Sequence, residues 1–542
     1  MKHLNYRHIL FLLLCFTLAA CKVSCVKSKR GNVTEKVIVN DAKQIVNLNL
    51  KEGQEYVVDG VVDLKGGNAV LPANVLISFK KDGAIVNGTL TGNGTRIRSD
   101  HESVLGVHLK GTWCVDKISD LAFSPEYLSD YDIIHNLNIV QSDTVYNKLT
   151  IHRNYKINIP QTGGYALSMS SNSSLQLKST LTLVPNDYAK YKIILIENKE
   201  NVSVIGGSLV GDVGNHRYVE GTTSEWGMGI SILNSRNVTV SDINISRCIG
   251  DGIYISGGNE PSIGIYEKAS KNVIIKDVTC DKNRRQGLSI IHVDGLTVKD
   301  CSFVNTGQIE STPPSAGIDI EPNSNMSVRN VLIEKCTIIN NKGMAVATNN
   351  TYEDNGKLNY EKIVFSNCYT DGLLKAQSDD LLFRKCTFKE IRFASVYAPT
   401  HISFEDCVIS GGYGIIIYAP SKQGVDSKNR LLAVDFKNCT ITTTEQKTAT
   451  NALISCYKNY ISNIKSISFE GCRLVIPPTK EEQYSITDND FNGKILINHS
   501  VIDMKGPSFH SSVIGLTNSK IVCKKGYGIS SNESNTIISG VQ

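Results

Sequence analysis

The sequence is poor in proline and in net charge, and it has no long apolar run beyond its first residues. Only 13 of its 542 residues are proline, against 43 glycines, which suits a chain with many turns. The 57 basic and 52 acidic side chains leave a net charge of +5, too small to indicate a nucleic-acid partner. No later apolar run approaches the roughly 20 residues of a membrane-crossing helix. With 41% hydrophobic residues, the chain is expected to be a turn-rich β protein with a buried core.

The N-terminus carries the pattern of an export signal. Lys2 and Arg7 precede an apolar stretch from Ile9 to Ala20, which has the length of a secretory signal. The run Leu18-Ala19-Ala20-Cys21 resembles a bacterial lipobox, which implies lipidation of Cys21 and a basic tether over 21–35. An ordinary signal peptide with a chance cysteine is the alternative. The resemblance implies a lipid anchor in a bacterial cell envelope, at the outer membrane, with the periplasmic or surface side open.

The body of the chain is built from one repeat. A segment of the form Gly, apolar, any residue, apolar begins at Gly229, Gly252, Gly287, Gly317 and Gly343, with gaps of 23, 35, 30 and 26 residues. A second alternating run follows most of these segments. Alternation with period two, rich in β-branched residues and bounded by Gly, Asn and Ser, predicts short strands.

Cysteines mark the same period. Stacked residues on neighbouring coils are about 4.8 Å apart, whereas a disulfide brings its Cβ atoms to about 3.8 Å. We therefore expect this column to be reduced and buried. No Cys-x-x-Cys or Cys-x-x-His pair occurs, so no metal site is predicted from the cysteines. The column comprises Cys301, Cys336, Cys368, Cys386, Cys407, Cys439 and Cys472.

This periodicity resembles the right-handed parallel β-helix of the pectin-lyase-like superfamily, over roughly residues 36–540. The resemblance implies an all-β, single elongated domain. We expect a signal peptide over 1–20, the lipidated Cys21 and tether over 21–35, a cap with the first coils over 36–190, and the main β-helix over 191–542. An interruption from Trp113 to Asn138 predicts a short helix starting near Pro125.

Aligning the glycines predicts two outward columns of side chains. Asp319 and Glu321 then share one outward face, and Asp251, Arg284 and Arg285 lie at the turn that opens onto it. From residue 345 onward the polar column is expected to end, leaving scaffold coils. The first column is Ser231, Tyr254, Ser289, Asp319 and Ala345; the second is Leu233, Ser256, Ile291, Glu321 and Ala347.

The gathered charges predict a catalytic site. Asp251 is expected to act as acid or base, Asp319 and Glu321 as complementary carboxylates or as a Ca²⁺ site, and Arg285 as the anchor of a sugar carboxylate. No other cofactor is expected. Hydrolysis needs two carboxyl groups, and uronate elimination needs a base and a cation; both stay open. The expected substrate-binding residues are Arg284, Tyr254, Gln286, His216, Glu225 and Trp226.

Family motifs narrow this prediction. The run Gly250-Asp251-Gly252 is similar to the strand of polygalacturonase-type hydrolases that carries two aspartates, but Gly250 replaces the first. Met228 stands where that family has histidine, so standard polygalacturonase chemistry is not predicted. The runs Asn283–Gly287 and Gly317–Asn323 resemble exported β-helix proteins of gut-type bacteria and some phage tail proteins.

Two functions remain open from the sequence. The first is a carbohydrate-active enzyme, a glycoside hydrolase or polysaccharide lyase, acting on a polysaccharide bound along the solenoid. The second is a non-catalytic glycan-binding or adhesin-like surface protein, since a solenoid offers extended binding surface without chemistry.

Overall fold

The computed structural model divides the chain into two compact units. The predicted signal peptide, Cys21 and the tether lie outside the residues that the structure describes. The expected boundary between residues 190 and 191 stays a prediction. The described residues are 36–40, 51–258, 268–323, 326–349, 359–393, 400–411, 415–417, 432–443, 452–456, 464–476, 485–487, 494–504, 509–524, 529–534 and 537–541.

The first unit comprises the chain up to Asp116 and the segments Ala122–Leu128 and Ile139–Asn147. Its strands pair in parallel, and the 15-residue β6 takes part in two sheets. The side chain of Trp113 at the end of β7 is buried. The strands are β1 (Lys36–Val39), β2 (Glu55–Val58), β3 (Val61–Asp63), β4 (Asn68–Val70), β5 (Leu76–Phe79), β6 (Ala84–Arg98) and β7 (Leu105–Trp113).

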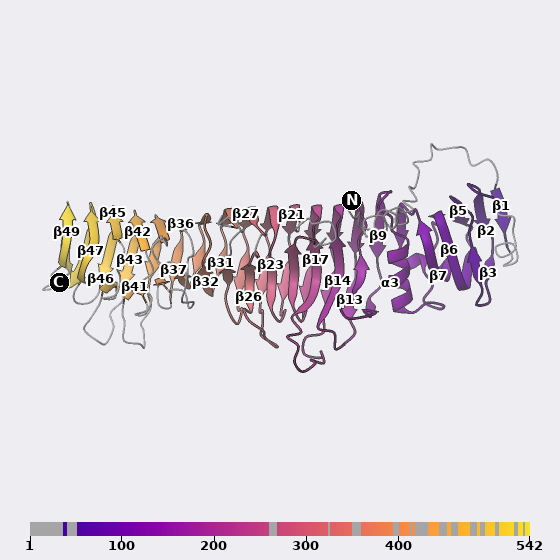
Figure 1. The fold of residues 1–542 in the computed structure, drawn as a ribbon, viewed down its shortest axis with the longest axis horizontal. Helices are drawn as coiled ribbons and strands as arrows, with labels where there is room; N and C mark the ends of the chain where they lie inside the picture. The colour runs from indigo at the N-terminus through magenta and orange to yellow at the C-terminus, as the bar shows by residue number, and fades with distance from the viewer. Residues whose placement is uncertain are drawn as a thin grey trace, which may run out of the picture. The chain divides into compact units, whose positions relative to one another are not determined.

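The second unit consists mainly of three long parallel sheets, to which most successive coils add one strand each (Figure 1). The predicted all-β parallel solenoid is confirmed. The first sheet has β10 (Tyr155–Ile157), β13 (Thr180–Leu183), β16 (Ser208–Val210), β19 (Asn244–Ser246), β22 (Thr279–Asp281), β25 (Ser302–Val304), β28 (Thr337–Ile339), β31 (Tyr369–Thr370), β34 (Thr387–Phe388), β37 (Val408–Ser410), β40 (Thr440–Thr442), β43 (Arg473–Ile476), β46 (Val501–Met504), β48 (Lys520–Lys524) and β50 (Ile537–Val541).

The second sheet of this unit carries the predicted site, and we call it the site sheet. It has β11 (Tyr165–Ser168), β14 (Lys190–Glu197), β17 (Trp226–Leu233), β20 (Asp251–Ser256), β23 (Gln286–Ile290), β26 (Ala316–Ile320), β29 (Val346–Thr348), β32 (Leu373–Ala376), β35 (Glu390–Phe393), β38 (Ile415–Ile417), β41 (Ala452–Cys456) and β44 (Ser485–Thr487).

The third sheet has 16 strands. They are β8 (Lys117–Ser119), β9 (Asn147–Ile151), β12 (Ser173–Leu177), β15 (Glu200–Ile205), β18 (Arg236–Ser241), β21 (Ser270–Lys276), β24 (Val293–Lys299), β27 (Val328–Glu334), β30 (Tyr360–Ser366), β33 (Leu381–Arg384), β36 (Thr400–Glu405), β39 (Leu432–Lys437), β42 (Ile464–Glu470), β45 (Lys494–Asn498), β47 (Phe509–Thr517) and β49 (Ile529–Ser534).

Two short helical segments accompany these sheets, the 3₁₀ segment Asp120–Ala122 and helix α3 (Asp130–Ile139). The helix begins after the predicted start near Pro125, because Ser129 and Asp132 cap it. The Asp132 amide donates to Ser129 Oγ at 3.3 Å, and the Ser129 amide donates to Asp132 Oδ2 at 3.1 Å. None of the helices in the described part of the chain is long and apolar enough to cross a membrane.

Asparagines recur near the start of successive strands of the third sheet. Asn201, Asn237 and Asn272 have φ values of 57°, 54° and 53°, in the left-handed region that asparagine tolerates better than most residues. Their side chains form a ladder, in which Asn237 Nδ2 donates to Asn201 Oδ1 at 3.0 Å and Asn272 Nδ2 donates to Asn237 Oδ1 at 3.2 Å. The ladder satisfies polar groups at the same position of successive coils.

The repeated glycines bring the site sheet close to the neighbouring wall. A Cβ atom added at Gly252 would lie 2.7 Å from both Cys280 Sγ and the Gly287 carbonyl oxygen. A side chain there would therefore force the coils apart. This close approach explains why glycine recurs at the start of these strands.

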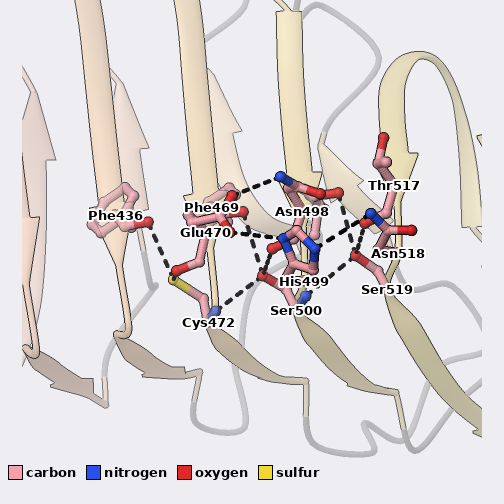
Figure 2. A network of polar contacts seen from close by, with 11 residues as sticks. Phe436, Phe469, Glu470, Cys472, Asn498, His499, Ser500, Thr517, Asn518 and Ser519 are labelled. Carbon is pink, nitrogen blue, oxygen red and sulfur yellow. Dashed lines mark hydrogen bonds and ion pairs between the residues drawn. The ribbon is translucent and has the colours of Figure 1, made fainter.

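The predicted reduced column is confirmed, since all seven of its cysteines are free and buried. Cys114, outside the column, is disulfide-bonded. Six of the seven thiols donate to a carbonyl of the previous coil, as Cys472 Sγ does to Phe436 O at 3.3 Å. In the last coils Ser500 and Ser519 take over this role, each donating to a carbonyl at 3.3 Å (Figure 2). A small donor side chain at this position therefore ties each coil to the one before.

Stacked phenylalanines fill the core of the C-terminal coils. Phe383, Phe404 and Phe436 occupy one register column, with ring centroids 4.9 Å and 4.8 Å apart. Each ring is at most 1% exposed. Their spacing equals the distance between coils, so one aromatic ring per coil packs face to face.

Replacing Phe404 by alanine is expected to destabilise these coils by about 3–5 kcal/mol, because a large cavity would open between two rings. Urea unfolding measures the loss. Leu332→Ala serves as the control, because Leu332 is 36% exposed and its truncation is expected to change stability by less than about 1 kcal/mol. Equal losses for the two variants would contradict the assignment.

Candidate functional site

The register of the site sheet supports the predicted outward column. Ile230 pairs with Ile253, Ile253 with Leu288, and Leu288 with Ile318. These residues are fully buried, so the inward column is as expected. The residues that follow them, Ser231, Tyr254, Ser289 and Asp319, form one column.

The predicted register beyond Asp319 is wrong by two residues. Asp319 pairs with Ala347 and not with Ala345. Gly343 lies in the turn before β29, where its amide donates to Ser315 O, so it does not occupy the position of the earlier glycines. Lys375 and Arg392 continue the column, and the prediction that the polar column ends near residue 345 is therefore also wrong.

Arg285 is the centre of the candidate site. Its Nη1 lies 3.3 Å from Asp251 Oδ2, its Nη2 3.7 Å from Glu321 Oε2, and its Nε 3.9 Å from Glu225 Oε2. The Arg285 side chain is only 13% exposed. Burial opposes the charge of Arg285, but Asp251, Asp319, Glu225 and Glu321 together raise its pKa, so the guanidinium stays charged. The sequence predicted the grouping of Asp251, Arg285 and Glu321, and the structure brings them together.

Asp251 is completely buried beside this guanidinium. Its Oδ2 accepts a hydrogen bond from Ser289 Oγ at 2.7 Å, while its Oδ1 has no partner among the described residues. Burial raises the pKa of Asp251 to about 6, although Arg285 and the Ser289 hydrogen bond favour the charged form. Its contacts are therefore to side chains of the site, and not to a turn backbone.

Asp319 is also fully buried, and two amide side chains hold it. Gln286 Nε2 donates to Asp319 Oδ2, and Asn349 Nδ2 donates to Asp319 Oδ1 at 3.2 Å. Burial raises the pKa of Asp319 to about 8, and the negative charges of Glu321 and Asp251 act in the same direction. A protonated carboxyl group at neutral pH follows from this environment.

Asp319→Asn is expected to flatten the pH dependence of stability. Between the unfolded pKa near 3.9 and the folded value of about 8, the folded chain holds a proton that the unfolded chain has released. The free energy of unfolding therefore falls as pH rises, by at most about 1.4 kcal/mol per pH unit from this residue. Asparagine does not titrate, so its variant loses less stability between pH 5 and pH 7.5 in urea unfolding. Parallel losses would refute the raised pKa.

Trp226 and Tyr254 provide an aromatic surface beside the charges. Trp226 begins β17 and is 39% exposed, and its ring meets Tyr254 edge to face with centroids 6.2 Å apart. The Arg285 guanidinium lies 5.9 Å from the Trp226 ring centroid. Trp226 therefore presents part of its ring to solvent, and its predicted role in stacking a sugar ring stays a prediction.

Arg284 and His216 contact the loop that precedes β17. Arg284 Nη1 donates to the carbonyl oxygens of Thr223 and Ser224 at 3.1 and 3.0 Å, and Arg284 lies over the Tyr218 ring. His216 Nδ1 lies 2.8 Å from Asp212 Oδ2, with both side chains inaccessible to solvent. The structure places both residues in the support of this loop, and their role in substrate binding stays a prediction.

Sequence reasoning missed two residues of the site, Asn349 and Lys375. Lys375 Nζ donates to Asn349 Oδ1 at 2.8 Å, so Asn349 connects the lysine to Asp319. Gly372 and Leu373 begin this strand like the earlier repeats, but Lys375 stands where the repeat has its second apolar residue. The repeat pattern therefore did not predict this strand or place Lys375 on the outward column.

A cation fits poorly at the centre of the site, because Arg285 already occupies it. The part of the chain that the structure describes contains no group of three or more His, Cys, Asp or Glu side chains suited to hold a metal ion. The calcium alternative for Asp319 and Glu321 thus gains no support from the geometry.

Two curated relatives from Bacillus subtilis match parts of the chain. The SPbeta prophage-derived protein YorA is 34% identical over 169 residues, and YclG is 33% identical over 144 residues. These matches cover 30% and 26% of this chain, and only 28% and 24% of the relatives' own lengths.

Solved structures of similar architecture include a mutant tailspike protein of E. coli bacteriophage HK620. It is 11% identical, with a TM-score of 0.48, over 78% of this chain and 80% of that chain. The A-module of the Azotobacter vinelandii mannuronan C-5 epimerase AlgE6 is 12% identical, with a TM-score of 0.32, over 76% of this chain and 94% of that chain.

The family model described as "right handed beta helix region" matches residues 138–358 and 264–441, together more than half of the chain. The parallel sheets and the stacked coils agree with that description. The chain therefore belongs to the right-handed β-helix family.

Proposed function

We propose that this chain is a glycoside hydrolase, and that the carboxyl groups of the protein around Arg285 form the site where a polysaccharide is cleaved. The observation that carries the proposal is a cluster of four carboxyl groups around Arg285, two of which are fully buried. Asp251 and Asp319 have raised pKa values of about 6 and about 8, and the cluster also contains Glu225 and Glu321 on the same arginine. Glycoside hydrolysis uses one protonated and one ionised carboxyl group.

The engagement of Arg285 favours hydrolysis over elimination. A lyase needs a cation that neutralises the carboxylate of the sugar. Arg285 already contacts three carboxylates of the protein, so its charge is compensated before substrate arrives. Arg285 is thus better suited to organise the carboxyl groups than to bind a uronate.

Exposure divides the four carboxyl groups into two roles. Glu321 is 40% exposed and Glu225 is 23% exposed, so these two are assigned to contact with the sugar. Because both contact one guanidinium, their carboxyl groups lie at most about 10 Å apart, which is compatible with inverting hydrolysis. The buried Asp251 and Asp319 are positioning residues that keep protons in the cluster. Trp226 and Tyr254 are assigned to sugar stacking.

Glycan binding without cleavage is the second candidate. It is favoured by the complete burial of Asp251 and Asp319, because a catalytic acid normally reaches its substrate. The partly exposed Trp226 suits binding equally well.

Incubation with a panel of polysaccharides tests both candidates. We expect new reducing ends without the ultraviolet absorbance of an unsaturated uronate. Appearance of that absorbance would refute the hydrolase and show that the chain is a lyase. Retention of a glycan in affinity electrophoresis with no cleavage would establish the binder.

The cell envelope is the proposed location, with Cys21 as the lipidated residue. The support is the lipobox-like run that ends at Cys21. Incorporation of labelled palmitate in a bacterial host, and its loss in Cys21→Ser, tests this assignment. Equal labelling of both proteins would refute it.

A further inference from the structure

Lys375 lies on the same outward column as the candidate site. The column runs from Asp319 through Ala347 to Lys375, one residue per coil. At about 4.8 Å per coil, the Lys375 backbone is about 10 Å from that of Asp319. Arg392 follows in the next coil. Positive side chains therefore extend from the carboxyl cluster along the direction in which the coils stack.

An amide side chain connects Lys375 to the cluster. Lys375 Nζ donates to Asn349 Oδ1 at 2.8 Å, and Asn349 Nδ2 donates to Asp319 Oδ1 at 3.2 Å. Because an ammonium group only donates, it fixes the amide with its N–H groups toward Asp319.

The other side of Asp319 repeats this arrangement. Arg285 Nη1 donates to Gln286 Oε1 at 3.0 Å, and Gln286 Nε2 donates to Asp319 Oδ2. One cation and one amide thus flank the buried carboxyl group on each side. Lys375 and Arg285 are the two ends of one hydrogen-bonded chain, and Asp319 lies at its centre.

Lys375 differs from Arg285 and Arg392 in how its charge is compensated. Arg285 contacts three carboxylates, and Arg392 Nε lies 2.5 Å from Glu390 Oε1. Among the described residues, no carboxylate lies within ion-pair distance of Lys375. Burial lowers the pKa of Lys375, while Asp319 and Glu321 act against this. A half-buried ammonium group whose hydrogen-bond acceptor is a neutral amide gains most from an incoming anion.

We propose that Lys375 anchors a subsite for an anionic group, a carboxylate or a sulfate ester, on the bound glycan. The subsite lies beside the carboxyl cluster around Arg285, and its assignment to a cleaved substrate rests on the proposed hydrolase function. The substrate is then an acidic polysaccharide whose charged group lies about two coils from the sugar at Glu321. Lys375 determines specificity through charge, and Asn349 holds its ammonium group in place.

Binding by the full chain tests the subsite without requiring cleavage. The probes are polygalacturonate for carboxylate, λ-carrageenan for sulfate, and carboxyl-reduced polygalacturonate as the neutral glycan, all in affinity electrophoresis. We expect retention by an anionic probe and weaker retention by the neutral one. Lys375→Gln is expected to weaken the anionic interaction by about tenfold or more, as the loss of a charge-assisted contact predicts. Lys375→Arg should preserve it.

The matched control is Lys437→Gln, which removes an exposed lysine from the third sheet and should bind like the parent chain. If a probe is cleaved, Lys375→Gln should raise KM with little change in kcat. Equal binding by Lys375→Gln and the parent chain, or no retention of either anionic probe, would overturn the subsite.

The two proposals fail separately. Retention that depends on Lys375 without any cleavage would refute the hydrolase and leave the subsite. Cleavage that is insensitive to glycan charge and to Lys375→Gln would refute the subsite and leave the hydrolase.

Discussion

Replacing Glu321 by glutamine is expected to reduce polysaccharide cleavage by about 10²–10⁴-fold, the usual contribution of a positioned general acid or base. Glutamine preserves the size of the side chain but can neither accept nor release the proton. Because Glu321 is 40% exposed and contacts Arg285 at 3.7 Å, its loss leaves no buried cavity. The rate of reducing-end formation measures the effect, and urea unfolding shows that the fold is kept.

The control for this prediction is Glu405→Gln. Glu405 lies on the third sheet and pairs with Arg384 at 2.8 Å, with both side chains partly exposed. The substitution removes one carboxylate and one ion pair, as Glu321→Gln does. Glu405, however, lies on another sheet and in a later coil than the carboxyl cluster. We expect the Glu405→Gln protein to cleave at the parent rate. A Glu321→Gln protein with near-parent activity would remove Glu321 from the mechanism.

The second large effect is expected from Arg285→Gln, in the stability of the fold. The substitution leaves the buried Asp251 without its cation, and removing one partner of a buried ion pair typically costs about 3–5 kcal/mol. The loss should be larger at pH 8 than at pH 5. The reason is that the pKa values of Asp251 and Asp319 are about 6 and about 8, so protonation relieves their repulsion at the lower pH. Urea unfolding at both pH values measures the difference.

Arg384→Gln is the matched arginine substitution. Its guanidinium is 47% exposed, and exposed ion pairs contribute about 0–1 kcal/mol. We expect only a small loss of stability that varies little with pH. If Arg285→Gln were no more destabilising than Arg384→Gln, the arginine would not be the centre of the cluster. Cleavage by the Arg285→Gln protein should also fall, since Asp251, Glu225 and Glu321 would lose their common partner.

The repeat in the sequence predicted most of the site sheet. The glycines at 229, 252, 287 and 317 mark positions where a Cβ atom has no room, so they fix the register of four coils. Gly343 has the same local sequence but lies in a turn. Local pattern therefore could not distinguish it, and only the pairing of Asp319 with Ala347 decides the register there.

The sequence predicted the charged residues around Arg285, but it did not predict Asn349 and Lys375 or the burial of the carboxyl groups. Alternation assigned Asp319 to the outward face, which is correct, yet its side chain has no exposed surface. Outward from a solenoid wall does not mean exposed to solvent, because loops and neighbouring side chains cover part of the wall. The hydrogen bonds of Asp319 to Gln286 and Asn349 join residues that are far apart in sequence, and no local signal predicts them.

The sequence by itself determined the solenoid, its reduced cysteine column and the charged residues on one face. It could do so because a period of one coil places chemically equivalent residues in the same environment, and each coil depends mainly on its neighbours. Only the tertiary structure decided that Arg285 joins three carboxylates and that Lys375 belongs to the same column. The loops between strands vary in length from coil to coil. The spacing of residues in the sequence therefore does not determine which residues stack on one another. Only the folded coils show these neighbours and the side chains that bury each residue.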